Sequence, residues 1–212
     1  MAEEEPGKNP IVFVIEDDAS LRDALSSLFR SVGLQVKTFA AAPDFLQTEL
    51  PDVPCCLVLD IRLPGTSGLD IQNELAKANI QVPIVFMTGH GDIPMTVRAM
   101  KGGAVDFLAK PFRDQDMLDA VQAGMERDRK RREAEHSIAD LKTSFKSLTA
   151  REQEILGLVT AGLMNKQIAG KIGLSEITVK VHRGNVMRKM GAKSLADLVR
   201  IAEALGVRRA SP

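Results

Sequence analysis

Residues 57–60 read Leu-Val-Leu-Asp, a short apolar run that ends in a carboxylate. The same pattern occurs earlier in the chain, where the apolar residues 11–15 run into Glu16 and Asp17. Each run has the length of a buried strand, and each ends in acidic side chains. The pattern predicts neighbouring strands that carry carboxylates at their carboxyl ends.

Two later apolar runs end in side chains that bind phosphate oxygens. Residues 84–87 run into Thr88, and residues 107–109 run into Lys110. Because the carboxyl ends of parallel strands share one edge of a sheet, an acidic pair, a single Asp, a hydroxyl and an ammonium would meet there. Mg²⁺ prefers carboxylates together with phosphate oxygens, and Thr and Lys stabilise the other phosphate oxygens. Taken one at a time, an Asp at a strand end could be a helix cap, Thr88 could cap a turn, and Lys110 could be a solvated charge. Because they stand at successive strand ends in this order, they predict a site for a metal ion and a phosphoryl group.

Amphipathic segments separate the apolar runs. After Asp18, the expected N-cap, apolar residues recur at helical spacing as far as Val32, and residues 35–39 read as a further strand. The remaining helices are expected at residues 43–49, 67–78, 94–100 and from 113 onward. Five strands alternating with five helices predict an α/β doubly wound parallel five-stranded sheet of order 2-1-3-4-5. Glu16, Asp17 and Asp60 would then lie at its switch point.

Composition is typical of a cytoplasmic protein with two modest cores. The chain has 212 residues, of which 44% are hydrophobic and 4% aromatic, so aliphatic side chains must fill most of the interior. We expect no membrane association, since no stretch reaches the roughly 18 apolar residues of a membrane span. The start, MAEEEPGKNP, also lacks the features of a signal peptide. Cys55 and Cys56 are adjacent, which is neither metal-ligand nor redox spacing, so we expect them to pack in the core.

The formal net charge of zero conceals a division along the chain. Residues 1–112 hold 15 acidic and 9 basic residues, residues 113–147 hold 8 of each, and residues 148–212 hold 5 acidic and 11 basic ones. An acidic domain joined to a basic one suggests that only the C-terminal domain meets a polyanion. Chance clustering is the alternative explanation of the charge division alone.

A single helical pattern extends from Arg113 to Lys146 without a proline. Its middle, ERDRKRREAEH, has no apolar face, so it must be solvated or covered by charge pairs. Apolar residues then return at spacings of three and four, from Ile138 to Leu148. This seam is too short to distinguish packing against the next domain from a coiled coil between two copies.

The C-terminal region predicts four short helices. Caps are expected at three of their starts: Thr149 with Glu152, Ser175, and Ser194. Gly173 makes a turn between the second helix, residues 165–172, and the third. The third helix carries the basic or imidazole side chains of Lys180, His182, Arg183, Arg188 and Lys189. Helix, turn and basic helix predict a helix-turn-helix that reads the major groove of DNA.

The stretches VIEDDASLR, LVLDIRLPGTSG and FMTGHGDIPMTVRAMKGGAVDFLAKPF resemble the receiver domain of bacterial two-component response regulators, which has a flavodoxin-like fold. The resemblance implies that Asp60 is the phosphoacceptor and that Mg²⁺ is the metal. The implied ligands are Glu16, Asp17, Asp60 and the backbone carbonyl of Arg62. Thr88 and Lys110 would bind the phosphoryl oxygens, Phe107 would be the aromatic switch residue, and Lys110-Pro111 would be a cis peptide.

The stretch LTAREQEILGLVTAGLMNKQIAGKIGLSEITVKVHRGNVMRKMGAKSLADLVR resembles the LuxR-type output domain of the NarL/FixJ class of response regulators. The resemblance implies base contacts by Thr178, Lys180 and Val181, phosphate contacts by Asn165, Lys166 and Lys189, and a place for Arg183 on the same DNA-binding surface. Gly184 stands where some relatives carry a basic residue that reads bases.

Together the resemblances predict a transcriptional activator that is switched by phosphorylation. The expected domains are a receiver at residues 10–125, a helical linker at 126–146 and a helix-turn-helix domain at 147–206. A sensor histidine kinase would phosphorylate Asp60, and the phosphorylated chain would form a homodimer on promoter DNA and engage RNA polymerase. The dimer face would include the helix that carries Arg98, Met100 and Lys101.

Two other classes of function remain open on sequence alone. Phosphatases of the haloacid-dehalogenase type also use Asp, Thr, Lys and Mg²⁺, but they place a second Asp two residues after the first, where this chain has Arg62. We therefore expect no enzyme activity beyond autodephosphorylation. A helix-turn-helix that serves protein contact or RNA control is the other alternative, and only the basic third helix argues against it.

Overall fold

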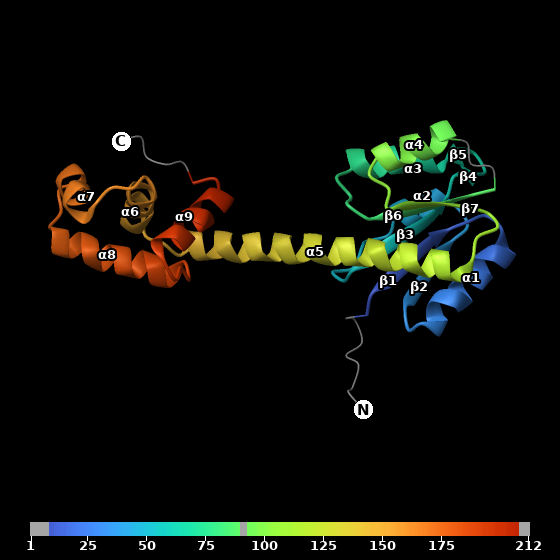
Figure 1. Ribbon diagram of the computed structural model, residues 1–212, viewed down its shortest axis with the longest axis horizontal. Coiled ribbons are helices and arrows are strands. Elements are labelled where there is room, and N and C mark those ends of the chain that lie inside the picture. Colours follow the sequence, from blue (N-terminus) through green and yellow to red (C-terminus); the bar gives the residue numbers. More distant parts are fainter. Residues whose placement is uncertain (1–8, 90–92, 208–212) are drawn as a thin grey trace, which may run out of the picture. The chain divides into compact units, whose positions relative to one another are not determined.

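Five parallel strands form the sheet of the N-terminal unit (Figure 1). The computed structural model describes residues 9–89 and 93–207, and the chain divides into two units, residues 1–132 and 133–212. The strands are β1 (Ile11–Ile15), β2 (Gln35–Phe39), β3 (Cys55–Asp60), β6 (Ile84–Thr88) and β7 (Asp106–Ala109). Their order is β2-β1-β3-β6-β7, which confirms the predicted doubly wound sheet.

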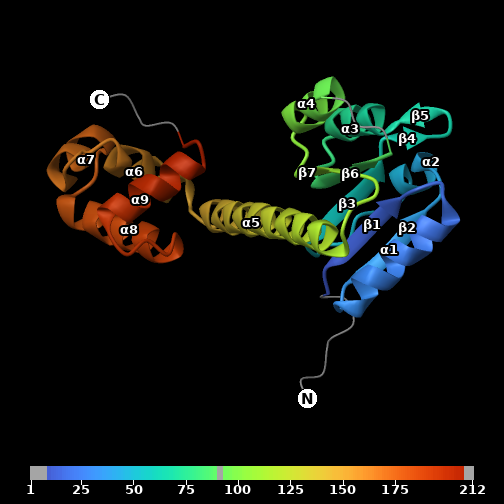
Figure 2. The same ribbon diagram turned by 45° about the vertical axis from the view of Figure 1, so that its right-hand side comes forward.

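Helices cover both faces of this sheet. The helices are α1 (Ala19–Ser31), α2 (Ala42–Leu46), α3 (Gly68–Lys77), α4 (Ile93–Lys101) and the first part of α5 (Asp114–Lys146). Helices α2, α3 and α4 pack on one face, and α1 and α5 pack on the other (Figure 2). Along β1, Phe13 belongs to the first core and Val12 and Val14 to the second. Burial on both faces explains why the strands read as continuous apolar runs.

The N-terminal unit contains one small element that the sequence patterns did not predict. Strands β4 (Arg62–Leu63) and β5 (Thr66–Ser67) form a small antiparallel hairpin directly after β3. Its turn is Pro64-Gly65, with a φ of 79° at Gly65, a conformation that glycine adopts at no steric cost. The Pro-Gly pair was the available signal for this turn.

The helix boundaries agree with expectation within a few residues. Asp18 caps α1, since its Oδ1 accepts hydrogen bonds from the backbone N–H groups of Ser20 and Leu21. Helix α2 ends at Leu46 rather than at residue 49. Gln47 is its C-cap, and the hydroxyl of Thr48 donates to the carbonyl of Asp44 in the last turn.

Helix α5 is continuous over its 33 residues, as predicted. Its charged middle is covered by pairs within the helix: Glu126 with Arg129 and Lys130, and Asp128 with Arg131 and Arg132. At the C-terminal end of the apolar seam, Leu148 is buried in the core of the C-terminal unit and Phe145 packs against that core. This end of the seam therefore packs against the domain that follows it, while Ile138 stays exposed.

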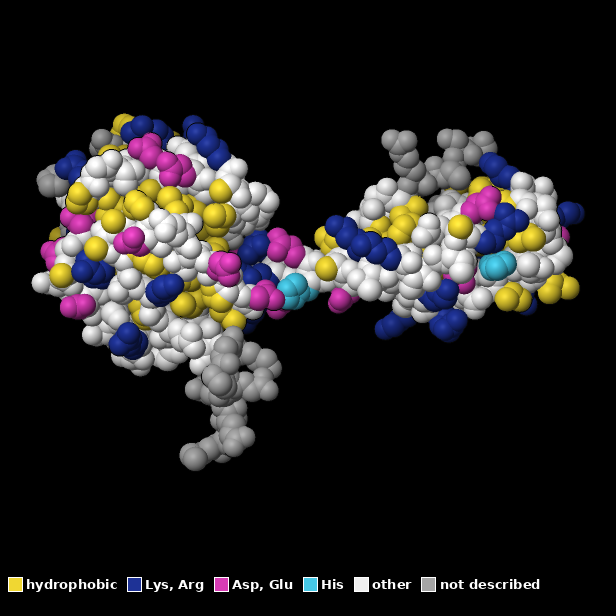
Figure 3. Space-filling model, turned by 180° about the vertical axis from the view of Figure 1, so that it is seen from behind, with side chains coloured by type: hydrophobic (Ala, Val, Ile, Leu, Met, Phe, Trp, Pro, Cys, Tyr) yellow, Lys and Arg dark blue, Asp and Glu magenta, His cyan; other side chains and the backbone are white. Residues whose placement is uncertain are grey.

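The C-terminal unit is a bundle of four helices with the end of α5. These helices are α6 (Ala150–Thr160), α7 (Asn165–Ile172), α8 (Glu176–Lys189) and α9 (Leu195–Ala204). The predicted capping box between Thr149 and Glu152 is present, and Gly173 makes the turn between α7 and α8 with a φ of 67°. Ser175 and Ser194 cap α8 and α9 as predicted. Figure 3 shows Lys and Arg side chains beside hydrophobic ones on one face of this unit.

The structure can be compared with two further expectations, the burial of the two cysteines and the lack of a membrane span. Cys55 and Cys56 are free and fully buried, which confirms core packing, and burial raises the pKa of the Cys55 thiol to about 11. Among the described residues, no helix combines the length and the apolar character that a membrane span requires. The first eight residues of the chain lie outside the described residues.

Candidate functional site

The register of the sheet brings the predicted strand-end residues to one edge. Ile15 pairs with Leu59 across β1 and β3, and Thr88 pairs with Ala109 across β6 and β7. The functional side chains follow or end these strands: Glu16 and Asp17 after β1, Asp60 at the end of β3, Thr88 at the end of β6, and Lys110 after β7. The convergence predicted from the sequence is thus present.

Three carboxylates form the acidic part of this edge. One oxygen from each of Glu16, Asp17 and Asp60 lies within 4.8 Å of the others. Glu16 and Asp60 are buried, with exposed fractions of 1% and 6%, whereas Asp17 is exposed. Converging carboxylate oxygens are the donors that a hard divalent cation prefers, so these residues fit a magnesium ion chemically.

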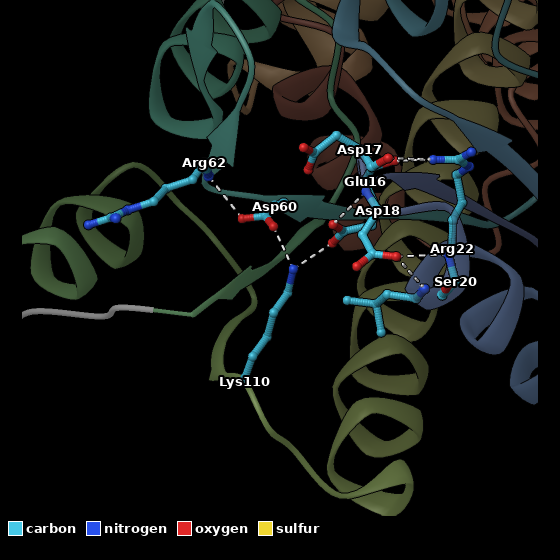
Figure 4. A network of polar contacts seen from close by, with 9 residues as sticks. Glu16, Asp17, Asp18, Ser20, Arg22, Asp60, Arg62 and Lys110 are labelled. Atoms are coloured by element: carbon cyan, nitrogen blue, oxygen red, sulfur yellow. Dashed lines mark hydrogen bonds and ion pairs between the residues drawn. The ribbon is translucent and has the colours of Figure 1, made fainter.

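Lys110 bridges two of the carboxylates (Figure 4). Its Nζ lies 2.5 Å from Oδ2 of Asp60 and 2.6 Å from Oε2 of Glu16. Burial alone would lower the pKa of Lys110, but the two carboxylates outweigh it and raise that pKa. Burial also raises the pKa of Glu16, against the hydrogen bond from Lys110, and the nearby Asp60 charge adds to the rise. The ammonium is therefore kept charged beside the strand-end carboxylates.

The backbone around Asp60 holds its carboxylate in place. Oδ1 accepts a hydrogen bond of 2.8 Å from the N–H of Arg62. Gly68, at the start of α3, donates its N–H to the carbonyl of Ile61 at 2.9 Å. A Cβ at Gly68 would lie 2.6 Å from the carbonyl oxygen of Asp60, so only glycine permits this close approach. Gly68 was not singled out by the sequence analysis, although it lies within the stretch LVLDIRLPGTSG.

Arg22 is a second residue that the sequence analysis missed. Its Nη1 donates to the carbonyl of Glu16 at 2.7 Å and to that of Asp17 at 3.1 Å, from one turn into α1 (Figure 4). These bonds fix the loop that carries the acidic pair. The signal was the position of Arg22 at the end of the stretch VIEDDASLR.

Thr88 lies on β6, which pairs with β3, and Phe107 lies on β7, which pairs with β6. Thr88 is fully buried at the end of β6. Phe107 is half-buried, and its ring centroid lies 6.5 Å from that of Phe86. The Lys110-Pro111 peptide is cis, as the resemblance implied.

The predicted DNA-contacting residues fall into two groups by their present contacts. Lys166, Lys180 and Val181 are exposed on α7 and α8. The half-buried residues are hydrogen-bonded within the unit: Thr178 to Ser175, Arg183 to Asn165, and Lys189 to Glu152 and the carbonyl of Ser147. The Nζ of Lys189 lies 2.7 Å from Oε2 of Glu152, so this ammonium already joins α8 to the start of α6.

Comparison with known protein families assigns a family to each of the two units. Residues 12–122 match the response regulator receiver domain, and residues 146–202 match the luxR family of bacterial regulatory proteins. The chain belongs to the NarL/FixJ class of response regulators. Its receiver implies a sensor kinase as partner, and its LuxR-type domain implies promoter DNA.

Individual relatives match this regulator over nearly its full length. Nodulation protein W of Bradyrhizobium diazoefficiens is 64% identical over 203 residues, which cover 96% of this chain and 89% of that protein. The transcriptional regulatory protein FixJ of Azorhizobium caulinodans is 42% identical and covers 92% and 93%. Among solved structures, the response regulator StyR has a TM-score of 0.83 at 51% identity, covering 92% of this chain and 98% of that one.

The comparisons and the geometry together give the regulator its general function. It couples phosphorylation to the control of transcription, through a receiver domain and a DNA-binding domain. This combination is typical of a regulator that is not an enzyme. It favours the regulator over the phosphatase considered on sequence alone.

Proposed function

We propose that Asp60 is the phosphoacceptor of this regulator and that Glu16, Asp17 and Asp60 bind Mg²⁺ together with the backbone carbonyl of Arg62. The observation that carries the proposal is the convergence of three carboxylates within 4.8 Å. The ammonium of Lys110, 2.5 Å from Asp60, adds the positive charge that a phosphoryl group requires.

The chemistry assigned to Asp60 is nucleophilic attack on a phosphohistidine of a sensor histidine kinase. A carboxylate oxygen of Asp60 forms a bond to phosphorus while the phosphorus–nitrogen bond breaks, and the leaving imidazole takes up a proton. Bound Mg²⁺ would neutralise charge on the phosphoryl oxygens. The N–H of Arg62 orients the nucleophile before the reaction, since it holds Oδ1 of Asp60.

Phosphorylation changes the partners of the residues around Asp60. It adds roughly one and a half to two negative charges at the end of β3. Lys110 would exchange its bond to the Asp60 carboxylate for one to a phosphoryl oxygen, and Thr88 would donate its hydroxyl to another. Phe107 would follow Thr88 inward and re-form the surface of α4, β7 and α5. Autodephosphorylation by water at this site would reset the regulator.

The altered surface would drive homodimerisation through the α4 side of the receiver. Val97 and Met100 are exposed apolar residues of α4 that such an interface would cover. A dimer would place two α8 helices on neighbouring half-sites of promoter DNA in the cytoplasm, where we expect it to activate transcription with RNA polymerase.

Contacts to DNA are proposed for α7 and α8. Thr178, Lys180, Val181 and Arg183 would face bases or the groove wall, and Asn165, Lys166 and Lys189 would contact phosphates. The exposed Lys180 and Lys166 support this assignment most directly. Lys189 would have to share its ammonium with Glu152, so we expect its phosphate contact to be the weaker one.

Labelling with a small acyl phosphate tests the site. Intact-mass measurement should show one added phosphoryl group on the wild-type chain only when Mg²⁺ is present. Asp60→Asn should show none, because its amide oxygen is a poor nucleophile. Asp17→Asn should require more Mg²⁺ for the same labelling.

Asp18→Asn is the matched control for Asp17, because Asn also caps helices and Asp18 caps α1. It should label at the same Mg²⁺ concentration as the wild type. Equal labelling of Asp60→Asn and the wild type would remove Asp60 from its proposed role.

A further inference from the structure

Two large apolar side chains project from α8 into solvent. Ile177 is 78% exposed and Val181 is 59% exposed, although both are β-branched aliphatic residues that favour burial. They are four residues apart, so they lie next to each other on one face of the helix. The opposite face of α8 packs in the core of the C-terminal unit through Val179 and Val186, and the C-cap residue Met190 packs there too. Packing within the unit therefore does not explain Ile177 or Val181.

The surroundings of this pair indicate a polyanion as its partner. Ile177 lies in the first turn of α8, two residues after the Ser175 cap and next to the exposed Glu176, the acidic residue of that turn. The exposed Lys180 lies between the pair in sequence, and Arg188 is exposed further along the same helix. The C-terminal residues 148–212 hold 11 basic and 5 acidic residues. An apolar pair within a basic surface is poorly suited to a hydrophobic protein partner and well suited to a groove that has phosphate walls.

The major groove of DNA contains one apolar feature, the C5-methyl group of thymine. In a helix-turn-helix, the N-terminal residues of the second helix contact base edges. We propose that Ile177, supported by Val181, reads thymine methyl groups in the half-site, so that Ile177 is a specificity-determining residue. This inference rests on the proposed DNA-binding function and adds to it the chemical feature that the helix recognises.

Met164 provides a matched control. It is also a large exposed apolar residue, with an exposed fraction of 66%, but it lies at the N-terminal cap of α7. The first helix of a helix-turn-helix crosses the DNA backbone, where no methyl group is available. Truncation of Met164 should therefore leave thymine recognition unchanged.

Replacement of thymine by deoxyuridine tests the proposal, because it removes one methyl group and leaves all hydrogen-bonding groups in place. A cognate duplex is first selected from random DNA with the full-length phosphorylated regulator, and its thymines are then replaced one at a time. For the wild type, we expect about fourfold weaker binding at one or two positions in each half-site, the loss expected for one buried methyl group.

Two variants test whether Ile177 causes the difference in affinity between the thymine and deoxyuridine duplexes. Ile177→Ala should bind the thymine duplex more weakly and should bind the thymine and deoxyuridine duplexes equally at one sensitive position. Met164→Ala should keep the full fourfold difference there. Far-ultraviolet circular dichroism of each variant checks that the total helix content of the chain is unchanged.

Two results would overturn the inference without affecting the proposed function. One is selective DNA binding by the wild type that no single deoxyuridine weakens. The other is a sensitive position at which Ile177→Ala still shows the wild-type difference. Failure to select any duplex would instead count against the proposed DNA-binding function itself, and the inference would fall with it.

Discussion

Asp128 is a fully buried carboxylate within a run of charged residues on α5. Its oxygens accept hydrogen bonds from Arg131 at 2.7 Å, from Arg132 at 2.7 Å and from the backbone N–H of Cys55 at 3.0 Å. Arg132 also reaches Asp52 in the loop before β3. At the scale of single residues, this cluster attaches the last turns of α5 in the N-terminal unit to the start of the central strand.

Removal of the Asp128 carboxylate should destabilise the receiver domain. Asp128→Ala removes a buried acceptor from two partly buried guanidinium groups and from the Cys55 N–H, which costs about 3 kcal/mol or more. Urea denaturation followed by circular dichroism would measure the loss. Asp140→Ala, which removes an exposed carboxylate from the same helix, should change the free energy of unfolding by less than about 0.5 kcal/mol. Equal stability of the two variants would contradict the account of the cluster.

The contribution of Asp128 should depend on pH in a defined direction. Burial alone would raise its pKa, but the hydrogen bonds from Arg132 and Arg131 outweigh burial and hold the pKa below its ordinary value of 3.8. The native state therefore binds fewer protons than the unfolded state near that pH, and the stabilisation is lost as the pH falls through the native pKa. The difference in stability between wild type and Asp128→Asn should be constant from about pH 6 to 8 and should shrink below about pH 4. A difference that grows towards low pH would contradict this assignment.

Alanine substitution of two lysines in the DNA-binding domain should weaken DNA binding in two different ways. Lys180→Ala should weaken binding to the cognate site by about 1 to 3 kcal/mol and relax base preference, because a base-edge contact discriminates among sequences. Lys166→Ala should weaken binding to cognate and random DNA alike and reduce the salt slope by about one, because a phosphate contact releases a counterion. Titrations of the cognate duplex and of a scrambled duplex at several salt concentrations would measure the affinities and the salt slopes. Equal losses for Lys180→Ala on cognate and scrambled DNA would show that α8 does not read bases there.

At the scale of elements, the approach of α5 to β3 depends on Gly124. A Cβ at this position would lie 2.6 Å from Sγ of Cys56. Alanine improves helix propensity by about 1 kcal/mol over glycine, but overpacking of a core costs about 1 to 3 kcal/mol. Gly124→Ala should therefore destabilise the receiver or leave it little changed, and the additional Cys56→Ala substitution should recover stability.

Gly170→Ala is the control for this comparison, since Gly170 lies in α7 with no atom within 4 Å of an added Cβ. It should stabilise the C-terminal unit by up to about 1 kcal/mol in thermal unfolding. Stabilisation of the same size by Gly124→Ala would show that α5 has room to accept the methyl group.

Elements and site differ in how far the sequence predicts them. The sheet and the convergence of Glu16, Asp60 and Lys110 were predictable, because parallel strands bring their carboxyl ends to one edge whatever the packing details. The hairpin of β4 and β5 was missed because each strand has only two residues, too few for periodicity. The burial of Asp128 was missed because it depends on a contact with Cys55, 73 residues away in the chain.

At the scale of the whole molecule, the two regions of opposite net charge carry the two different functional sites. Residues 1–112, which have an excess of acidic side chains, contain the receiver site, and residues 148–212, which have an excess of basic ones, contain the helix-turn-helix. Phosphorylation should raise the fraction of dimer through the α4 face, as sedimentation of the two forms would show. If both forms stay monomeric at tens of micromolar, pairing must come from adjacent half-sites on DNA.

The measurement that tests the central claim most directly is a titration of a selected promoter duplex, followed by fluorescence anisotropy, with and without a small acyl phosphate and Mg²⁺. For the wild type, the phosphodonor should lower the Kd by about tenfold, within the usual range of coupling between sites. For Asp60→Asn, the Kd should be the same with and without the donor. An equal response of both proteins, or no response of a wild type that is shown to be phosphorylated, would contradict control of DNA binding through Asp60.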